Sequence, residues 1–253
     1  MIPKYSLPEM SRIWSEENKM DKWLAVEIAV CEGWAELGVV PRDALESIRK
    51  ARYDLKRIEE IMAVSHHDVI SFLRSVAESL GEESRFIHLG LTSSDVIDTA
   101  LSLQLLDAVA LVHRDLEKLE GVLGRRAVRY KDTVMIGRTH GIHAEPTTFG
   151  FKLAEWVAET RRNLHRLDEA REQVAAGKIS GAVGTHANVP PEVEEFVCRK
   201  LGIEPVEVST QIVQRDRHAY LMATLAVIAS SMAFSRVTCP ALLKRSPGVE
   251  PRA

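Results

Sequence analysis

The sequence predicts an all-α protein built mainly from long helices. Residues 95–120 contain neither glycine nor proline, and leucine, alanine and valine recur there at intervals of three and four. The same spacing returns after Pro146 and continues to Gly177. Such spacing places apolar side chains on one face of a helix, and strand-like runs are few. Helices of this length are typical of a long-helix bundle.

The composition is that of a globular protein of 253 residues, with 45% apolar and 27% charged residues. A formal net charge of −3 gives no reason to expect nucleic acid or an anionic membrane as a partner. The sequence shows no signal peptide and no uninterrupted apolar run long enough to cross a bilayer. Cys31, Cys198 and Cys239 lack metal-type spacing, so we interpret them as thiols of a reducing compartment. We therefore expect a cytoplasmic protein.

Several short helices precede the first long one. Residues 21–37 have a helical apolar face, and Gly38 suits a C-cap because glycine tolerates a left-handed backbone. Two short helices rich in arginine and glutamate are expected within residues 43–62. Apolar residues spaced by three and four predict another helix over 69–80, which Gly81 ends.

Each of the two long helices is entered from a polar segment. Thr92 and Asp95 fit the spacing of a capping box at the start of the first, with aspartate in place of the usual glutamate. Before the second, residues 137–149 hold two imidazoles, one guanidinium, one carboxylate and three hydroxyls. We interpret this stretch as a short polar loop that feeds a helix, which is where sites tend to be built.

The remainder of the chain is less regular. A glycine-rich connector at 177–186 precedes a short helix opened by two prolines, and residues 206–208 are expected to be extended. A third apolar helix is predicted over 215–234. From residue 235 onward the sequence has no helical period, so we expect an irregular tail over 235–253.

Four polar clusters at helix starts or glycine-rich turns are candidates for chemistry. Helix N-termini with hydroxyl groups bind phosphate or carboxylate, and histidine acts as an acid or a base near neutral pH. Structural roles are the alternative, because a Thr-Ser pair also caps a helix and adjacent histidines are often a solvated pair. The clusters are residues 65–68, His88 with Thr92 and Ser93, Thr139 and His140 with His143, and residues 209–211 with Arg215.

Other chemistries find less support. His140 and His143 have a spacing that suits metal ligands, but no HExxH pattern and no third ligand at a suitable spacing accompany them. No serine lies in a GxSxG context, and the connector lacks the Gly-Lys-Ser/Thr ending of a phosphate loop. On spacing alone, the sequence predicts an anion-binding acid/base site shared among loops, and we expect no metal.

Taken together, these clusters resemble the adenylosuccinate lyase family, in its bacterial form, of the fumarase/aspartase superfamily. The resemblance extends in order from residue 1 to about residue 233. It rests on residues 4–6, 66–69, 88–96, 137–150, 177–185, 209–211 and 214–218.

The resemblance implies a β-elimination without metal or organic cofactor. Fumarate would leave adenylosuccinate to give AMP, and the same site would cleave the succinylated aminoimidazole carboxamide ribotide of purine biosynthesis. It also implies a homotetramer whose long helices share a common core, with loops of three chains at each active site. The implied domains are a helical N-terminal domain over 1–92, a central long-helix domain over 93–234 that is incomplete, and a non-matching tail over 235–253, with the family's C-terminal domain absent.

The resemblance also assigns roles to individual residues. His140 would be the general acid that protonates the leaving nitrogen, and His67 would assist it. The family usually has arginine where this chain has Lys4, and lysine lacks the bidentate fork for phosphate. The residues implied in substrate binding are Lys4, Tyr5, His66, His67, Asp68, His88, Thr92, Ser93, Thr139 and Gln211.

One family feature is not found within these 253 residues. The superfamily's serine-rich loop, which runs into Met-Pro-x-Lys-x-Asn and supplies the general base, has no counterpart in the sequence. We therefore expect little or no lyase activity from this chain alone. Two alternatives stay open at this point: an inert N-terminal portion that binds nucleotide or assembles through its helices, and a sister lyase acting on argininosuccinate.

Overall fold

The structure, a computed structural model, describes residues 3–244, and the side chains of residues 4–233. The chain divides into two compact units. Unit 1 comprises Met1–Ala108 and Val174–Arg215, and unit 2 comprises Val109–Gln173 and Asp216–Ala253. The domain boundary predicted between residues 92 and 93 stays a prediction.

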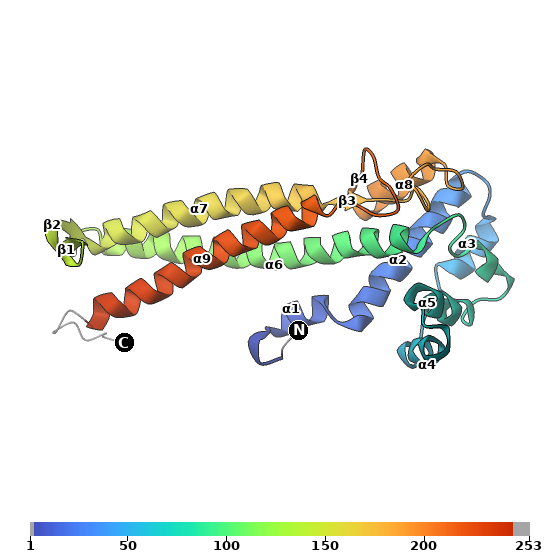
Figure 1. Ribbon diagram of the computed structural model, residues 1–253, viewed down its shortest axis with the longest axis horizontal. Helices are drawn as coiled ribbons and strands as arrows, with labels where there is room; N and C mark the ends of the chain where they lie inside the picture. The colour runs from blue at the N-terminus through green and yellow to red at the C-terminus, as the bar shows by residue number, and fades with distance from the viewer. Residues whose placement is uncertain (1–2, 245–253) are drawn as a thin grey trace. The chain divides into compact units, whose positions relative to one another are not determined.

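Unit 1 is a set of short helices around the first part of one long helix (Figure 1). Its helices begin where the sequence offers caps: Ser15 Oγ accepts from Asn18 N at 3.1 Å, and Asp54 Oδ1 accepts from Lys56 N at 2.8 Å. The elements are η1 (Pro3–Tyr5), α1 (Pro8–Ile13), α2 (Glu16–Glu36), α3 (Arg42–Ile48), α4 (Leu55–Ser65), α5 (Asp68–Ala77), η2 (Glu82–Phe86), the start of α6 (Ser93–Arg129), β3 (Ala176–Gly177), α8 (Pro191–Leu201) and β4 (Glu204–Pro205).

The core of unit 1 joins helices that are distant in the sequence. Trp23 of α2 is 2% exposed and meets Phe72 of α5 edge to face, with ring centres 5.5 Å apart. Val96 and Ala100 of α6 are fully buried in the same cluster. The cluster therefore fixes α2, α5 and the first turns of α6 against one another, and the loops that enter those helices are held with them.

Unit 2 contains the rest of α6, a hairpin and two long helices. The hairpin pairs β1 (Val134–Thr139) with β2 (Ile142–Thr148), and the helices are α7 (Phe149–Val174) and α9 (Asp216–Lys244). Asn163 of α7 donates to Ser231 of α9 at 2.9 Å, and both side chains are buried. His113 of α6 lies 3.2 Å from Asp168 of α7. Polar contacts thus supplement the apolar packing between these helices.

The prediction of an all-α fold dominated by long helices is confirmed, with three corrections. Residues 137–149 form most of a β-hairpin and not a loop, and α9 continues to Lys244, so the chain stays helical over 235–244 where an irregular tail was expected. The expected extended segment at 206–208 is displaced, since β4 covers Glu204–Pro205 and pairs in parallel with β3. The loss of a clear apolar period does not by itself end a helix, because backbone hydrogen bonding needs no amphipathic face.

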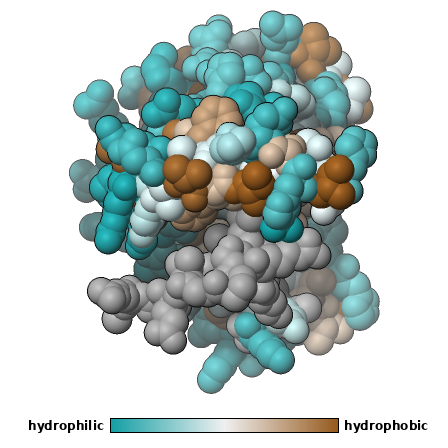
Figure 2. Space-filling model, turned by 90° about the vertical axis from the view of Figure 1, so that its left-hand side faces the viewer, coloured by the Kyte–Doolittle hydropathy of each residue, from teal (hydrophilic) through white to brown (hydrophobic). Residues whose placement is uncertain are grey.

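Exposed apolar side chains occur in and beside the hairpin. Val128, Val134, Ile142 and Phe151 are each at least 67% exposed. Figure 2 shows the side on which the hairpin is drawn in Figure 1, and hydrophobic side chains are scattered there among hydrophilic ones. Within the described residues, α6 is long and apolar enough to cross a membrane, but half of that stretch is buried in the chain. Core helices meet the same criterion, so it decides nothing by itself.

Candidate active site

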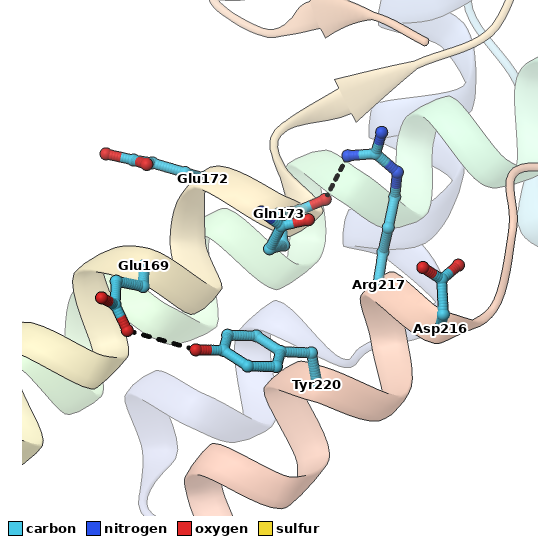
Figure 3. A pocket seen from close by; sticks show the side chains of 6 residues that line it. All are labelled: Glu169, Glu172, Gln173, Asp216, Arg217 and Tyr220. Carbon is cyan, nitrogen blue, oxygen red and sulfur yellow. Dashed lines mark hydrogen bonds between the residues drawn. The ribbon is translucent and has the colours of Figure 1, made fainter. Parts of the chain in front are cut away.

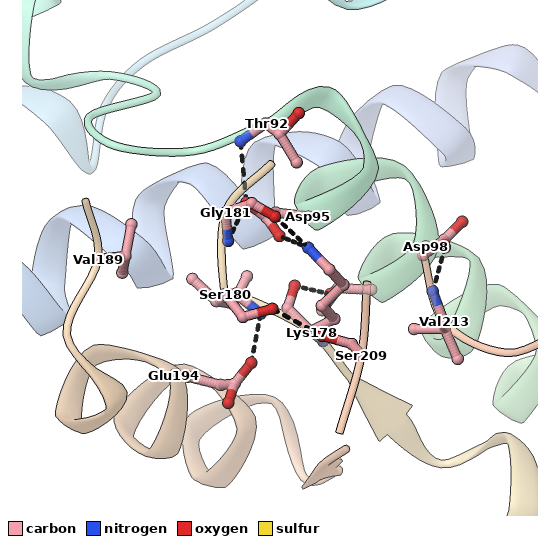
Figure 4. Close-up of polar contacts among 12 residues, drawn as sticks. Thr92, Asp95, Asp98, Lys178, Ser180, Gly181, Val189, Glu194, Ser209 and Val213 are labelled. Atoms are coloured by element: carbon pink, nitrogen blue, oxygen red, sulfur yellow. Dashed lines mark hydrogen bonds and ion pairs between the residues drawn. The ribbon is translucent and has the colours of Figure 1, made fainter. Parts of the chain in front are cut away.

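The first turn of α6 fixes the loop before it (Figure 4). The Asp95 carboxylate is fully buried and accepts from the backbone N–H of Thr92 at 2.9 Å and of Gly181 at 3.2 Å. The bond to Thr92 is the carboxylate half of the predicted capping box. Thr92 and Ser93 are thereby held, partly exposed, at a helix N-terminus, where unpaired N–H groups and the helix dipole favour an anion.

Lys178 is the cation that faces Asp95, and neither side chain is exposed. Its ammonium donates to Asp95 Oδ1 and, at 2.8 Å, to the carbonyl of Gly181. Its backbone N–H donates to Thr99 Oγ1 at 3.0 Å. A buried charge is stable only when it is paired and hydrogen-bonded, and the Lys178 ammonium meets both conditions through Asp95 and Gly181. The pair ties the connector after α7 to the start of α6.

Asp98 holds a third segment one turn further along α6. It is 2% exposed, and its carboxylate accepts from Val213 N at 2.8 Å and from Arg215 Nη2 at 2.9 Å. Gln211 lies two residues before Val213 and is exposed. Arg215, which the sequence places beside the predicted site, is therefore engaged in an ion pair, whereas Gln211 is left accessible by the same attachment.

The connector and the Gln211 segment are also joined directly. Ser180 Oγ and Ser209 Oγ are 2.8 Å apart, and both residues are buried. Glu194 of α8 accepts from Ile179 N at 2.7 Å. Burial raises the pKa of the Glu194 carboxyl, and the N–H of Ile179 acts in the opposite direction. The N-terminal end of α6 thus brings together the predicted residues Thr92, Ser93 and the segment of Gln211.

His88 lies in the loop that leads to Thr92. Its backbone N–H donates to Glu27 Oε2 at 2.9 Å, and its Nδ1 lies 2.6 Å from Glu27 Oε1. Trp34, two turns further along α2, donates from Nε1 to the carbonyl of Leu89 at 3.2 Å. Two hydrogen bonds therefore attach the loop to α2, one through the backbone N–H of His88 and one through the carbonyl of Leu89. The His88 imidazole is partly exposed.

His66, His67 and Asp68 form the junction between α4 and α5. His66 is the C-cap of α4 with φ of 52°, and His67 is the N-cap of α5. His67 Nδ1 accepts from Ile70 N at 3.4 Å, and Asp68 Oδ1 accepts from Val69 N at 2.7 Å. The structural role is present, since His67 caps α5, and about half of its side chain is exposed. Its role in a site stays a prediction.

Lys4 and Tyr5 lie in η1 at the start of unit 1. The Lys4 ammonium is 5.7 Å from the centre of the Tyr5 ring, and Tyr5 is 79% exposed. A cation over an aromatic face is weakly attracted to it at an exposed site. The two side chains are accessible for the predicted phosphate contact, which stays a prediction.

Thr139 and His140 lie at the turn of the unit 2 hairpin (Figure 1). Thr139 pairs with Ile142, and the two turn residues between them, His140 and Gly141, have φ of 51° and 78°. Positive φ at both central positions is the geometry of a type I′ hairpin turn. His140 is exposed on the hairpin, and no group of three metal-ligating side chains includes it within the part of the chain that the structure describes.

The predicted site residues therefore fall into two groups. Thr139 and His140 belong to unit 2, and the other predicted residues belong to unit 1. Unit 2 also has a pocket of about 550 Å³ (Figure 3), in which Tyr220 donates to Glu169 at 3.1 Å and Arg217 donates to the carbonyl of Gln173 at 3.0 Å. None of the predicted residues lines this pocket, so it is not part of the candidate site.

Comparison with known proteins decides the family. A family model described as lyase matches residues 4–235. The chain belongs to the lyase family. This lyase is 54% identical over 233 residues to adenylosuccinate lyase of Bacillus subtilis (strain 168), which confirms the resemblance of its motifs. The match covers 92% of the chain and 54% of the relative, so the chain spans about half the length of the relative it matches.

Solved structures confirm the fold of the lyase. Fumarate lyase from Mesorhizobium sp. BNC1 superposes with a TM-score of 0.87 at 28% identity, over 93% of this chain and 57% of that one. The 3-carboxy-cis,cis-muconate lactonizing enzyme from Pseudomonas putida gives a TM-score of 0.83 at 32% identity, over 92% and 56%. The same helical architecture therefore occurs in proteins named for different reactions, and fold alone does not select a substrate.

Sequence reasoning missed the buried polar residues that hold the site loops. Glu27 and Asp98 sit within helical patterns, where a lone carboxylate is usually solvated, and Lys178 lies in a glycine-rich connector whose pattern gives it no role of its own. One signal was present for Asp98: it interrupts the apolar run of a helix that begins with a capping box. The signal for Glu27 is weaker, because helix α2 has acidic residues on several faces.

Proposed function

We propose that this lyase contributes to adenylosuccinate lyase activity in purine biosynthesis. The reaction would be the β-elimination of fumarate from adenylosuccinate, giving AMP, and from the succinylated aminoimidazole carboxamide ribotide. The observation that supports this most strongly is the 54% identity over 233 residues to a relative named for that activity. The muconate lactonizing enzyme is only 32% identical to this chain, so it gives less support for a muconate reaction here.

The chemistry of the elimination matches the exposed groups of the chain. The leaving nitrogen must gain a proton as its bond to carbon breaks, and charge that develops on the neighbouring carboxylate must be stabilised by donors. We assign the proton to His140, whose surface position leaves its ring open to a ligand. Thr92 and Ser93, at the start of α6, would supply hydroxyl and N–H donors to an anionic group of the substrate.

The remaining residues would bind the nucleotide and succinyl parts. Lys4 and Tyr5 would reach the phosphate, His67 would assist near the reacting atoms, and Gln211 would hold the succinyl part. His66, Asp68, His88 and Thr139 would line the pocket. The general base is not assigned to any residue of this chain, because its 253 residues contain no serine-rich loop followed by Met-Pro-x-Lys-x-Asn.

We further propose that the site is assembled from several copies, in a cytoplasmic homotetramer. α6 is one continuous helix of 37 residues, about 55 Å long at 1.5 Å per residue. Thr92 directly precedes this helix, and β1 begins five residues after its last residue. From the resemblance to the family, we propose that different chains supply Thr92 and His140 to one site. Sedimentation equilibrium of the chain tests the assembly.

Titration calorimetry with AMP tests the binding part of the proposal. We expect the chain to bind AMP and Ser93→Ala to weaken binding about ten- to a hundredfold, the loss of one hydrogen bond to a charged group. Ser230→Ala is the matched control, because Ser230 is an exposed hydroxyl of α9 bonded to the carbonyl of Val227 at 2.7 Å. Unchanged affinity in Ser93→Ala would exclude a contact between Ser93 and the phosphate.

A spectrophotometric assay of adenylosuccinate cleavage tests the chemistry. We expect this chain alone to be far slower than a complete enzyme of the family, because an acid without its base completes only half of the proton transfer. Rates near those of the complete enzyme would contradict that argument. A panel with argininosuccinate and 3-carboxy-cis,cis-muconate distinguishes the related reactions, and binding of AMP without any turnover identifies a binding-only portion.

A further inference from the structure

Glu27 of α2 is a fully buried carboxylate that has no part in the reaction proposed above. Both of its oxygens face the same residue. Oε2 accepts from the backbone N–H of His88 at 2.9 Å, and Oε1 lies 2.6 Å from His88 Nδ1. Within residues 3–244, His88 is its only ion-pair partner. One carboxylate oxygen of Glu27 therefore contacts the main chain of His88, and the other contacts its ring.

The chemistry of the two groups determines where the ring proton lies. A backbone N–H can only donate, and an ionised carboxylate can only accept. At the 2.6 Å contact, a carboxylate Oε1 can accept from Nδ1 of His88 only if Nδ1 carries the proton. The other ring nitrogen, Nε2, has no hydrogen-bond partner among the described residues, and the side chain is 20% exposed. The nitrogen directed away from Glu27 is the one available to a ligand.

The backbone around His88 limits other orientations of the ring. His88 has φ of 63°, a left-handed conformation that histidine adopts more readily than most residues. The next residue is anchored through its carbonyl to Trp34 Nε1, at 3.2 Å. Gly90 also has positive φ, of 76°, and a side chain there would meet Asn188. The loop is thus constrained on both sides of the imidazole.

We propose that Glu27 is a positioning residue of this site: it fixes the proton of His88 on Nδ1 and presents Nε2 to the polar groups of the bound nucleotide. The inference rests on the proposed function for the identity of the ligand, but the proton position rests on the contacts of this chain alone. His88 lies four residues before Thr92 in the same loop. Glu27 would therefore act on the substrate only through the ring that it holds.

The variant Glu27→Gln gives a sharp test because its amide cannot reproduce both contacts. The backbone N–H of His88 still donates, so the amide oxygen must remain opposite it. The NH₂ group then faces Nδ1, which must become an acceptor. We expect the ring proton to move from Nδ1 to Nε2. A residue with a merely structural role would change stability without reversing the tautomer.

Long-range ¹H–¹⁵N correlation spectra of histidine-labelled chain measure this directly, and His88→Gln assigns the signal. We expect a protonated, pyrrole-type Nδ1 in the unmodified protein and a pyridine-type Nδ1 in Glu27→Gln. Glu117→Gln is the matched control, since Glu117 lies 3.5 Å from His113 Nδ1 on α6, and it should leave the His88 signals unchanged. A pyridine-type Nδ1 in the unmodified protein overturns the proposal even if Glu27→Gln fails to fold.

Titration with AMP separates this proposal from the proposed function. If AMP binds, we expect Glu27→Gln and His88→Gln to weaken it by a similar factor, and the double variant to be no weaker than His88→Gln alone. Additive losses would overturn the positioning role. If AMP does not bind the unmodified chain, the assignment of the ligand fails, while the spectra still decide whether Glu27 sets the tautomer.

Discussion

Removing the Lys178 ammonium should destabilise unit 1 more than any surface ion pair could. Lys178→Met keeps most of the volume of the side chain but leaves the Asp95 carboxylate without its cation in a site where neither residue is exposed. Breaking a buried pair on one side costs about 3–5 kcal/mol, because the remaining charge is left uncompensated. The hydrogen bonds from Thr92 N and Gly181 N to Asp95 remain and place the cost at the lower end of this range.

The second substitution should recover much of that loss. In Asp95→Asn with Lys178→Met, no charge is left in the interior, and the amide oxygen can still accept from Thr92 N. We therefore expect the double variant to lose at least about 2 kcal/mol less than the sum of the two single variants, since contacting groups are not additive. A double variant that loses less stability than the sum of the single variants indicates an ion pair, whereas additive losses indicate two independent contributions to packing.

Urea unfolding, with hydrogen exchange of the peptides that contain residues 92–98 and 178–184, measures the cycle. The control cycle uses the same substitutions at a partly exposed pair: Lys22→Met and Asp107→Asn, whose side chains are 2.7 Å apart in unit 1. Exposed pairs contribute about 0–1 kcal/mol, so we expect a coupling below 1 kcal/mol there. If the Lys178 and Asp95 variants add to within about 0.5 kcal/mol, the reasoning is refuted.

Three further predictions concern the same unit. Gly90→Ala should cost at least about 1–2 kcal/mol, measured by urea unfolding, because an added Cβ at positive φ would lie 2.6 Å from the carbonyl oxygen of Asn188. Cys31 and Cys198 should resist iodoacetamide at pH 8 until urea is added, because burial and nearby carboxylates raise the pKa of both thiols to about 12; mass spectrometry of labelled peptides detects early modification, which would contradict this. Glu194→Gln should flatten the dependence of stability on pH, because a raised pKa gives stability that is present below the usual 4.5 and is lost as the pH rises through the folded value. An unaltered pH slope in that variant would show that Glu194 is not the group concerned.

The long helices were predictable because a helix that packs through one face needs apolar residues at intervals of three and four in its sequence. Leu116 of α6 and Leu153 and Trp156 of α7 are buried as the spacing of three and four predicts. The start of α6 was also predictable, because Asp95 at the capping-box position does accept from Thr92 N. Local rules succeeded where the relevant partner lies within one turn.

The hairpin was missed because its residues obscure the alternation of a strand. Gly137 leaves one position without a side chain, and the pairing shifts register between Ile136 and Arg138. A Cβ at Gly137 would lie 2.6 Å from the carbonyl oxygen of Glu145, so the strands approach too closely for any other residue. The turn at His140 and Gly141 lacks the Asn-Gly or Asp-Gly signal that marks most type I′ turns.

The long-range partners of the buried carboxylates were missed for a different reason, which bears on how the site is built. Asp95 and Asp98 bind partners 83 to 117 residues away in the sequence, and no local pattern specifies such contacts. The loops that they hold are polar and have few apolar side chains of their own, so backbone N–H groups and two cations take the place of hydrophobic anchors. A hydrogen bond to a buried carboxylate is directional, whereas apolar contact is not. The residues that fix the site loops are therefore polar residues inside the core, and a substitution that keeps the fold can still misplace Thr92 or Gln211.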